Sequence, residues 1–346
     1  MSITSFLLFT LFVSLTLHSK PLHSLVSSPY LSPTIIYPDY QNMLSKFKVF
    51  VYEPNKPFTF NSPAESLFYT SLRTSPFVTQ KADEAHLFFV PFPSDLSTRS
   101  IARLVRGLRT ELPYWNRTLG ADHFYVSCAG IGYESDRNLV ELKKNSVQIS
   151  CFAATAGKFI PHKDISLPPV VFSDAPHAPS NKTTTFLGYF RHSGVKESTL
   201  AKELIGDPHF VIETEPSDHM TFVERLSRSK FCLFDYGIDV SWIGEALRFG
   251  CVPAVIADLP IHDLPFMDVL RWQEIAVFVG SGGGAGEAKR VMGGVSRDRY
   301  KRMRELGVTS SQHFVWNPSP QPFDCFNTLM YQLWLRRHTI RYVRRE

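Results

Sequence analysis

An acidic side chain and its polar neighbours in the second half of the chain have the types and spacing of a nucleotide-binding site. Glu245 lies one turn into an expected helix at 242–249, and Tyr236 and Ser241 lie in the polar stretch before that helix. A carboxylate at this point can accept two hydroxyl hydrogen bonds from a ribose. The helix dipole also favours an acidic residue in the first turn, so spacing alone leaves both interpretations open.

Two cations that follow an earlier apolar run could bind phosphate. The run 185–190 is typical of a strand, and the segment after it carries Arg191 and Lys196. A basic loop between a strand and a helix suits a diphosphate, because loop N–H groups and the helix N-terminus point there. Arg191 and Lys196 are therefore candidates for neutralising the charge that develops on a departing phosphate. Two solvated loop cations would fit the sequence equally well.

These side chains must be positioned by a unit of strand, helix and strand. The residues 231–234 form a short apolar run typical of a strand buried on both faces. The helix at 242–249 has apolar residues at helical spacing, and Gly250 is its expected end. A second buried strand is expected at 251–256, where Pro253 indicates a strand start or an edge. Ligands of such units bind at the carboxyl ends of the strands, which places the loop before the helix at the mouth.

The first half of the chain also alternates between strand and helix patterns. Strands are expected at 47–52, 85–91, 123–126 and 145–152, and helices at 65–74 and 100–112. This is the spacing of parallel βαβ units. The best boundary between two such lobes is 174–184, which is crowded with Pro, Ser, Asn and Lys.

Several motifs, in order along the chain, resemble the exostosin-like glycosyltransferases of plants. They are KVFVYEPNKPF, EAHLFFVPF, GADHFYVSCAGIG, FLGYF, GEALRFGCVPAVIAD, LPFMDVLRWQEIAVFV and HFVWNPSPQPFDCFNTLMYQLWLRR, spread over about 46–342. Their succession makes the resemblance specific, whereas any one motif alone would be weak. It implies an α/β fold of two Rossmann-like lobes facing a cleft, called GT-B. It also implies an inverting transfer of sugar from a UDP-sugar to a cell-wall polysaccharide or glycoprotein glycan, without a metal or other cofactor.

The resemblance also implies how the chain is divided. Residues 46–178 would form an acceptor-side lobe, and 179–320 a lobe that binds the nucleotide sugar. The remaining residues, 321–346, would be a helix that packs across the lobes, followed by a basic tail.

Inversion at the sugar carbon needs a base that takes the proton from the attacking hydroxyl. Candidates at strand ends of the first lobe are Asp95, Asp122 and His123, with Glu65 on the neighbouring helix. We put forward Asp95 and His123. A histidine at the start of a strand is more often packed in the core than used as a base.

Three positions depart from the family pattern. Trp242 stands where relatives usually carry Arg, Ala129-Gly130 where they carry His-Asp, and Glu197 close to where they often carry Arg. Each change removes charge near the donor or the acceptor, although Trp242 could stack on a uracil or sugar face. A second hypothesis is therefore a protein of this fold that has lost catalysis and acts as a glycan-binding or complex-forming subunit.

The N-terminus carries an apolar run at 3–17, nearer in length to a signal-peptide core than to a spanning helix. We predict a signal-anchor or signal peptide at 1–20, followed by a Ser- and Pro-rich stem at 21–45. The resemblance favours the anchor, and with it a single-pass type II protein of the Golgi membrane with a lumenal catalytic part; secretion is the less favoured alternative. In either case Asn116 and Asn181 are candidate glycosylation sites.

The charge distribution and the glycine patterns argue against several other classes of protein. The net charge of +5 comes largely from the C-terminal tail, and no groove-reading motif accompanies it, so nucleic acid is not an expected partner. The glycine-rich stretch 281–286 lacks the Lys-Ser/Thr ending of a P-loop and is interpreted as a linker. A G-x-G-x-x-G turn followed by an acidic ribose partner is missing, which argues against a dinucleotide dehydrogenase.

The five cysteines show no C-x-x-C spacing, so a zinc site is not expected. Cys232 and Cys251 lie in apolar strands and are expected to be buried thiols. Cys128 and Cys151 could pair in an oxidising compartment. The odd number leaves one cysteine unpaired.

Overall fold

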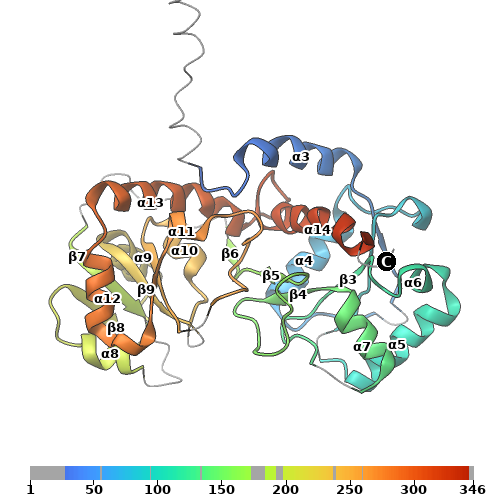
Figure 1. The fold of residues 1–346 in the computed structure, drawn as a ribbon, viewed down its shortest axis with the longest axis horizontal. Coiled ribbons are helices and arrows are strands. Elements are labelled where there is room, and N and C mark those ends of the chain that lie inside the picture. The colour runs from blue at the N-terminus through green and yellow to red at the C-terminus, as the bar shows by residue number, and fades with distance from the viewer. Residues whose placement is uncertain are drawn as a thin grey trace, which may run out of the picture.

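The computed structural model describes residues 28–54, 57–93, 95–132, 135–172, 184–191, 198–236, 239–258 and 260–342. Outside these residues lie the expected N-terminal membrane segment and most of the expected boundary at 174–184. The predicted residues Asn181, Lys196 and Glu197 also lie outside them. Two five-stranded parallel sheets, each with helices around it, form two lobes joined side by side (Figure 1). The predicted two-lobed α/β fold is confirmed.

Lobe 1 is built on a sheet with the strand order β1-β2-β3-β4-β5, in which every pair is parallel. The strands are β1 (Val49–Val51), β2 (Leu87–Phe89), β3 (His123–Val126), β4 (Val147–Cys151) and β5 (Ile165–Leu167). The helical segments are α4 (Pro63–Thr74), η1 (Ala82–Glu84), α5 (Thr98–Glu111), α6 (Pro113–Thr118) and α7 (Arg137–Asn145). Almost every strand residue is buried, as expected for a parallel sheet covered on both faces.

Lobe 2 is built on a sheet with the order β11-β10-β9-β7-β8. Its strands are β7 (Phe186–Arg191), β8 (Phe210–Glu213), β9 (Ser229–Asp235), β10 (Val252–Ile256) and β11 (Val277–Val279). Its helical segments are α8 (Thr199–Leu204), α9 (His219–Arg228), α10 (Ile243–Arg248), α11 (Trp272–Ile275), η2 (Ser281–Gly283), α12 (Gly284–Gly293) and α13 (Arg297–Ser310). The direction in which strands are added reverses between β7 and β9, and ligands of open parallel sheets bind at such a point.

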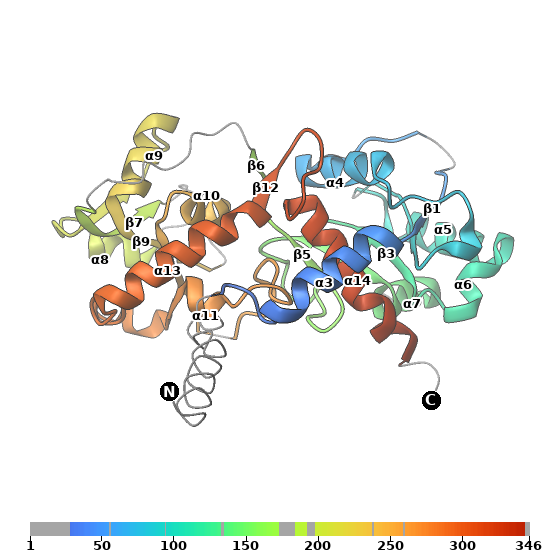
Figure 2. The same ribbon diagram turned by 90° about the horizontal axis from the view of Figure 1, so that it is seen from above.

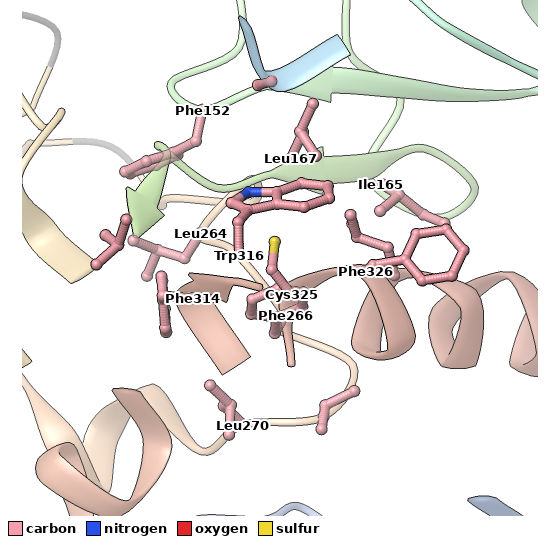
Figure 3. Packing of buried hydrophobic residues seen from close by; sticks show 14 of the residues in the cluster. Phe152, Ile165, Leu167, Leu264, Phe266, Leu270, Phe314, Trp316, Cys325 and Phe326 are labelled. Atoms are coloured by element: carbon pink, nitrogen blue, oxygen red, sulfur yellow. The ribbon is translucent and has the colours of Figure 1, made fainter. Parts of the chain in front are cut away.

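Two short strands and the last helix connect the lobes. β6 (Val171–Phe172), after the lobe 1 sheet, pairs with β12 (Val315–Trp316), which follows α13 and η3 (Ser311–Phe314). The chain then returns to lobe 1 as α14 (Cys325–Tyr342), which lies against α4 and β5 (Figure 2). Figure 3 shows the core at this junction, where Trp316 lies among side chains of both lobes.

A stem was expected at 21–45, and for residues 33–45 this expectation is wrong. They belong to α3 (Pro33–Lys46), which buries Ile36, Tyr40 and Met43 and packs beside α14. The ring of Tyr40 stacks on Phe323 at a centroid distance of 4.0 Å. Local composition gave no sign of the helix, because its apolar side chains are buried by a segment almost 300 residues away.

The glycine-rich stretch 281–286 is not a linker either. It begins with η2 and runs into α12, whose Ala285, Ala288 and Met292 are buried in lobe 2. The backbone N–H of Ala285 donates to Glu203 Oε2 at 2.7 Å. That carboxylate supplies the hydrogen-bond acceptor that the helix start needs, which compensates for the poor helix propensity of its glycines.

Cys232 and Cys251 form a disulfide, so the expectation of two buried thiols is wrong. The turn after α10 brings Cys251 to a Cα distance of 5.6 Å from Cys232 in β9. Cys128 and Cys151 also pair, at the carboxyl ends of neighbouring strands. Cys325, buried in α14, is the unpaired cysteine.

Within the described part of the chain, no helix is both long enough and apolar enough to span a bilayer.

Candidate active site

A cavity of about 540 Å³ lies between the lobes, where strands of both sheets end. The loop after β4 contributes its lobe 1 wall, with Ala154, Thr155 and Gly157 among the lining residues. Lobe 2 contributes the ends of β9 and β10, part of the segment that follows β10, and Ser281 of η2. The carboxyl ends of strands from the two sheets therefore meet at one cleft, as the family resemblance implied.

Glu245 lies in the first turn of α10, at the strand-order reversal of lobe 2. It is half-buried, and burial raises the pKa of its carboxyl, while the nearby positive groups of His219, Arg191 and Arg248 oppose the rise. Gly250, with φ at 72°, ends the helix as expected. Glu245 follows β9 and Arg191 ends β7, so both lie by the strands between which the strand order reverses, and Glu245 is partly open to solvent.

Arg191 is the last residue of β7 and lies beside Glu213, the last residue of β8. Its Nε is 3.6 Å from Glu213 Oε1, and its guanidinium lies 4.7 Å from the ring centroid of Phe222. Burial raises the pKa of Glu213, but hydrogen bonds from Tyr189, Ser217 and Arg225 outweigh this effect and hold the pKa below its usual value. Glu213 is therefore an anion that positions two partly exposed cations, Arg191 and Arg225, at the carboxyl end of the sheet.

Tyr236 follows β9 and lines the cavity. Its hydroxyl donates to Oδ1 of Asp263, whose other oxygen, Oδ2, accepts the backbone N–H of Ala154 at 2.7 Å. Burial raises the pKa of Tyr236, and the carboxylate of Asp263 adds to the rise, so the hydroxyl stays a donor at neutral pH. A donor-binding role for Tyr236 would therefore use its ring or a lone pair of its oxygen.

Two other predicted donor-binding residues lie differently from the expectation. Ser241 is exposed, and both its backbone N–H and its hydroxyl donate to Asp239 Oδ1, at 3.0 and 2.6 Å. Trp242 is only 2% exposed and packs against Tyr189, Phe222 and Phe234. The prediction that its ring stacks on a uracil or sugar is wrong, because the core of lobe 2 already covers that ring.

Neither base candidate lines the cavity. His123 is 0% exposed, with Nδ1 2.8 Å from Asp122 Oδ1 and Nε2 2.8 Å from the hydroxyl of Tyr52. Burial lowers the pKa of His123, and Asp122 opposes this. Both residues belong to a buried network at the amino end of β3, so the base prediction for His123 is wrong. Asp95 is exposed in the loop between β2 and α5, away from the cavity wall.

The cavity instead holds three carboxylates that the sequence analysis missed: Asp235, Asp258 and Asp263. Asp258 accepts from the backbone of Ser281 at 2.8 Å and from the Ser281 hydroxyl, and these bonds lower its pKa. Asp235 accepts from Ser198 at 3.2 Å. All three follow or end strands of lobe 2, so the rule that ligands bind at carboxyl ends could have indicated them.

Two further predicted residues have other surroundings. Glu65 is fully buried in α4 and accepts the backbone N–H of Cys128 at 2.5 Å, which makes it a structural carboxylate of lobe 1. Asn116 is exposed in α6, and its amide donates to the carbonyl of Arg109 at 2.9 Å.

Within the described ranges, no group of three or more His, Cys, Asp or Glu side chains could hold a metal ion.

Two parallel α/β lobes whose strands end at a common cleft, with an acidic residue in the first turn of a helix at the strand-order reversal, define the GT-B class of protein. A model of the Exostosin GT47 domain matches residues 43–282. The chain belongs to this family of glycosyltransferases, as the motifs suggested.

Named relatives are similar over most of the chain. A probable glycosyltransferase of Arabidopsis thaliana is 28% identical, over 90% of this chain and 73% of the relative. The probable β-1,4-xylosyltransferase IRX10 of the same plant is 27% identical, over 83% of this chain and 81% of the relative. A probable glucuronosyltransferase of Oryza sativa subsp. japonica is 26% identical, over 82% and 79%.

Among solved structures, WaaG, a glycosyltransferase involved in lipopolysaccharide biosynthesis, is similar over 81% of this chain and 97% of its own. The identity is 9% and the TM-score 0.34, so this likeness supports no functional conclusion.

Proposed function

We propose that this protein is an inverting glycosyltransferase that takes a sugar from a UDP-sugar and transfers it to a cell-wall polysaccharide or a glycoprotein glycan. The observation that carries the proposal is the position of Glu245, in the first turn of the helix that follows β9, and of Arg191, at the end of β7, because the strand order of lobe 2 reverses between β7 and β9. A carboxylate there can accept both ribose hydroxyls, and the start of α8 and the end of β7 offer positive charge to a diphosphate. The family and the names of its relatives support the same chemistry.

The charge distribution of the cleft separates the donor from the acceptor. Asp235, Asp258 and Asp263 make the central cavity acidic, which repels a diphosphate. Arg191 and Arg225 lie at the other side of the reversal, by the ends of β7 and β8. We therefore assign the diphosphate to the Arg191 side and the hydroxyl-rich acceptor to the cavity, where Asp235 and Asp258 can accept hydroxyl hydrogen bonds.

The reaction would proceed by one displacement. An acceptor hydroxyl attacks the anomeric carbon of the donor sugar, the bond from that carbon to the β-phosphate oxygen breaks, and UDP leaves with the bonding electrons. The hydroxyl proton passes to a base, and the cations by β7 stabilise the charge on the departing phosphate. We propose no requirement for a metal or another cofactor.

We also propose that the protein is a type II membrane protein of the Golgi with its catalytic part in the lumen. Two disulfides support this location, because disulfides form and persist in the oxidising secretory pathway. Glycosylation at Asn116 and Asn181 and assembly with other glycosyltransferases are compatible with the same compartment.

UDP binding and UDP release from a panel of UDP-sugars by the purified lumenal part test the proposed activity. Glu245→Ala should weaken UDP binding by ~10–100-fold, since it removes an acceptor of charge-assisted hydrogen bonds, and should abolish transfer. Glu224→Ala, which removes an exposed carboxylate on α9, is the matched control. Equal binding by wild type and the Glu245 variant would refute the donor site.

A specific observation favours a second candidate function. The family's usual arginine is replaced by Trp242, and the tryptophan is buried in the core, so this position offers no cation to a diphosphate. Absence of transfer with every donor, together with retained glycan binding, would favour a non-catalytic glycan-binding or complex-forming subunit.

A further inference from the structure

Two segments from different lobes face each other across the cavity. We call residues 152–164, which follow β4, the lobe 1 loop, and residues 260–271, which follow β10, the lobe 2 segment. Both contribute cavity-lining residues, including Ala154 and Gly157 from the lobe 1 loop and Pro260 and Asp263 from the lobe 2 segment. The separation of these two segments therefore determines the width of the cavity.

One contact between the segments is made by Asp263 at the cavity wall. Its Oδ2 accepts the backbone N–H of Ala154 at 2.7 Å, and its Oδ1 accepts the hydroxyl of Tyr236. Asp263 is only 6% exposed, so the bond to Ala154 is largely shielded from water. A buried carboxylate that joins one lobe to the other in this way resists separation, because opening would strip it of a donor.

A second contact is made by Arg336 of α14, at the far end of the lobe 1 loop. Its Nε donates to the carbonyl of Lys163 at 2.7 Å, and its Nη2 donates to the carbonyl of Asp164 at 2.9 Å. The same Nη2 lies 2.7 Å from Asp268 Oδ2 in the lobe 2 segment. Both ends of the lobe 1 loop are thus held against lobe 2.

The loop itself is held rigidly to its own lobe. Asp164 accepts the backbone N–H of Gln148 at 3.0 Å and of Ile160 at 2.8 Å, and the side chain of Gln148 donates to the carbonyl of Lys158 at 2.8 Å. Beneath the polar contacts, side chains of both segments share one apolar core with Trp316 (Figure 3). The stretch around Ala154 is joined to lobe 2 by its hydrogen bond to Asp263 and by the Phe152 ring, which lies 6.2 Å from the ring of Tyr236 between centroids.

We propose that Asp263 is a positioning residue for the transfer reaction: it fixes the lobe 1 loop against lobe 2, and so holds the acceptor wall at a set distance from the donor. This inference rests on the proposed function for the reaction itself, but the contact between the lobes is independent of it. Asp263 acts through Ala154, and its loss impairs the use of acceptor and leaves the binding of UDP near Glu245 intact.

The test compares Asp263→Ala and Asp263→Asn with the wild-type lumenal protein. Asparagine keeps an oxygen that accepts from Ala154, whereas alanine removes both bonds and leaves that N–H without its acceptor. Asp83→Ala, which removes an exposed carboxylate in η1, is the matched control. Hydrogen exchange of peptides covering 152–161 is measured first, then UDP affinity, then the KM for acceptor and kcat of transfer.

The Asp263→Ala variant should show hydrogen exchange around Ala154 that is ~10-fold faster than in wild type, and a kcat/KM for the acceptor that is lower by ~10-fold or more. Its UDP affinity should stay within about twofold of wild type. The Asp263→Asn variant should keep most of the wild-type exchange protection and most of the wild-type kcat/KM. Unchanged exchange in the alanine variant would overturn the inference. So would faster exchange with unchanged transfer, or a fall in UDP affinity equal to the fall in transfer. If the wild type binds no UDP, the proposed function fails, while the exchange comparison still tests the contact.

Discussion

The indole ring of Trp242 lies 4.1 Å from the ring of Phe234, between centroids, in the core of lobe 2. Tyr189 and Phe222 complete its surroundings, at centroid distances of 5.5 and 6.0 Å. The residue that departs from the family pattern is therefore an internal packing residue. Its ring contributes apolar contact area inside lobe 2 and is not available to stack on a ligand.

This packing predicts that the usual family residue cannot be restored by a single substitution. Trp242→Arg would place a guanidinium among three aromatic rings, and we expect it to cost more than ~4 kcal/mol and to prevent folding. Trp242→Phe should cost only ~1–2 kcal/mol, because the indole N–H finds no partner among the described residues. Urea denaturation measures both variants. Ser241→Arg, one position earlier and exposed, is the control and should unfold like wild type.

The fold was largely predictable from the sequence because its strands are short, apolar and separated by helical patterns. The runs around 123–126 and 231–234 became β3 and the centre of β9. Pro253 is the second residue of β10, as a strand start allows, but β10 lies inside the sheet rather than at its edge. What the pattern could not give was α3, which depends on contacts with α14 at the other end of the chain.

The site was only partly predictable, for a physical reason. Glu245 and Arg191 follow from strand-end rules, since both lie where the order of strands reverses. His123 and Trp242 have suitable side-chain types but point into cores, and burial is a property of the fold rather than of the residue. Asp263 was missed because its role depends on Ala154, more than 100 residues earlier in the chain.

The disulfide assignment can be tested by counting thiols. Protein unfolded in guanidinium without reductant should react with one equivalent of a thiol reagent, from Cys325, and after reduction with five. Replacement of both Cys232 and Cys251 by alanine should lower the free energy of unfolding by ~3 kcal/mol, the value expected for a closed loop of this length. Three or more thiols before reduction would contradict the pairing.

The hydrogen bonds of the buried Arg336 predict a large stability contribution from one side chain. Arg336→Met keeps the apolar part of the side chain but leaves the carbonyls of Lys163 and Asp164 without their donor, whereas the Asp268 carboxylate keeps the donor Gln332. We expect a loss of ~2–4 kcal/mol in the free energy of unfolding, measured by urea denaturation. Arg299→Met, at an exposed position of α13, should change it by less than ~0.5 kcal/mol. Equal losses of unfolding free energy in the two variants would show that Arg336 does not stabilise the contact between the lobes.

His313 predicts how stability changes with pH. It is fully buried, with Nε2 3.1 Å from the hydroxyl of Tyr30 and Nδ1 2.9 Å from Thr328 Oγ1. Burial lowers its pKa from 6.5 to about 4. The unfolded chain therefore binds a proton below pH 6.5 that the folded chain takes up only near pH 4. The contribution of neutral His313 is complete above pH 6.5 and is lost as the pH falls between these values.

At pH 5 this loss amounts to ~2 kcal/mol, from 1.4 kcal/mol for each pH unit below 6.5. His313→Gln, which retains a donor and an acceptor but does not titrate, should flatten the fall in melting temperature between pH 7.5 and pH 5. His209→Gln, which replaces an exposed histidine, should keep the slope of wild type. Parallel curves for wild type and the His313 variant would mean that this histidine takes up its proton over the same pH range in the folded and the unfolded protein, which would contradict the lowered pKa.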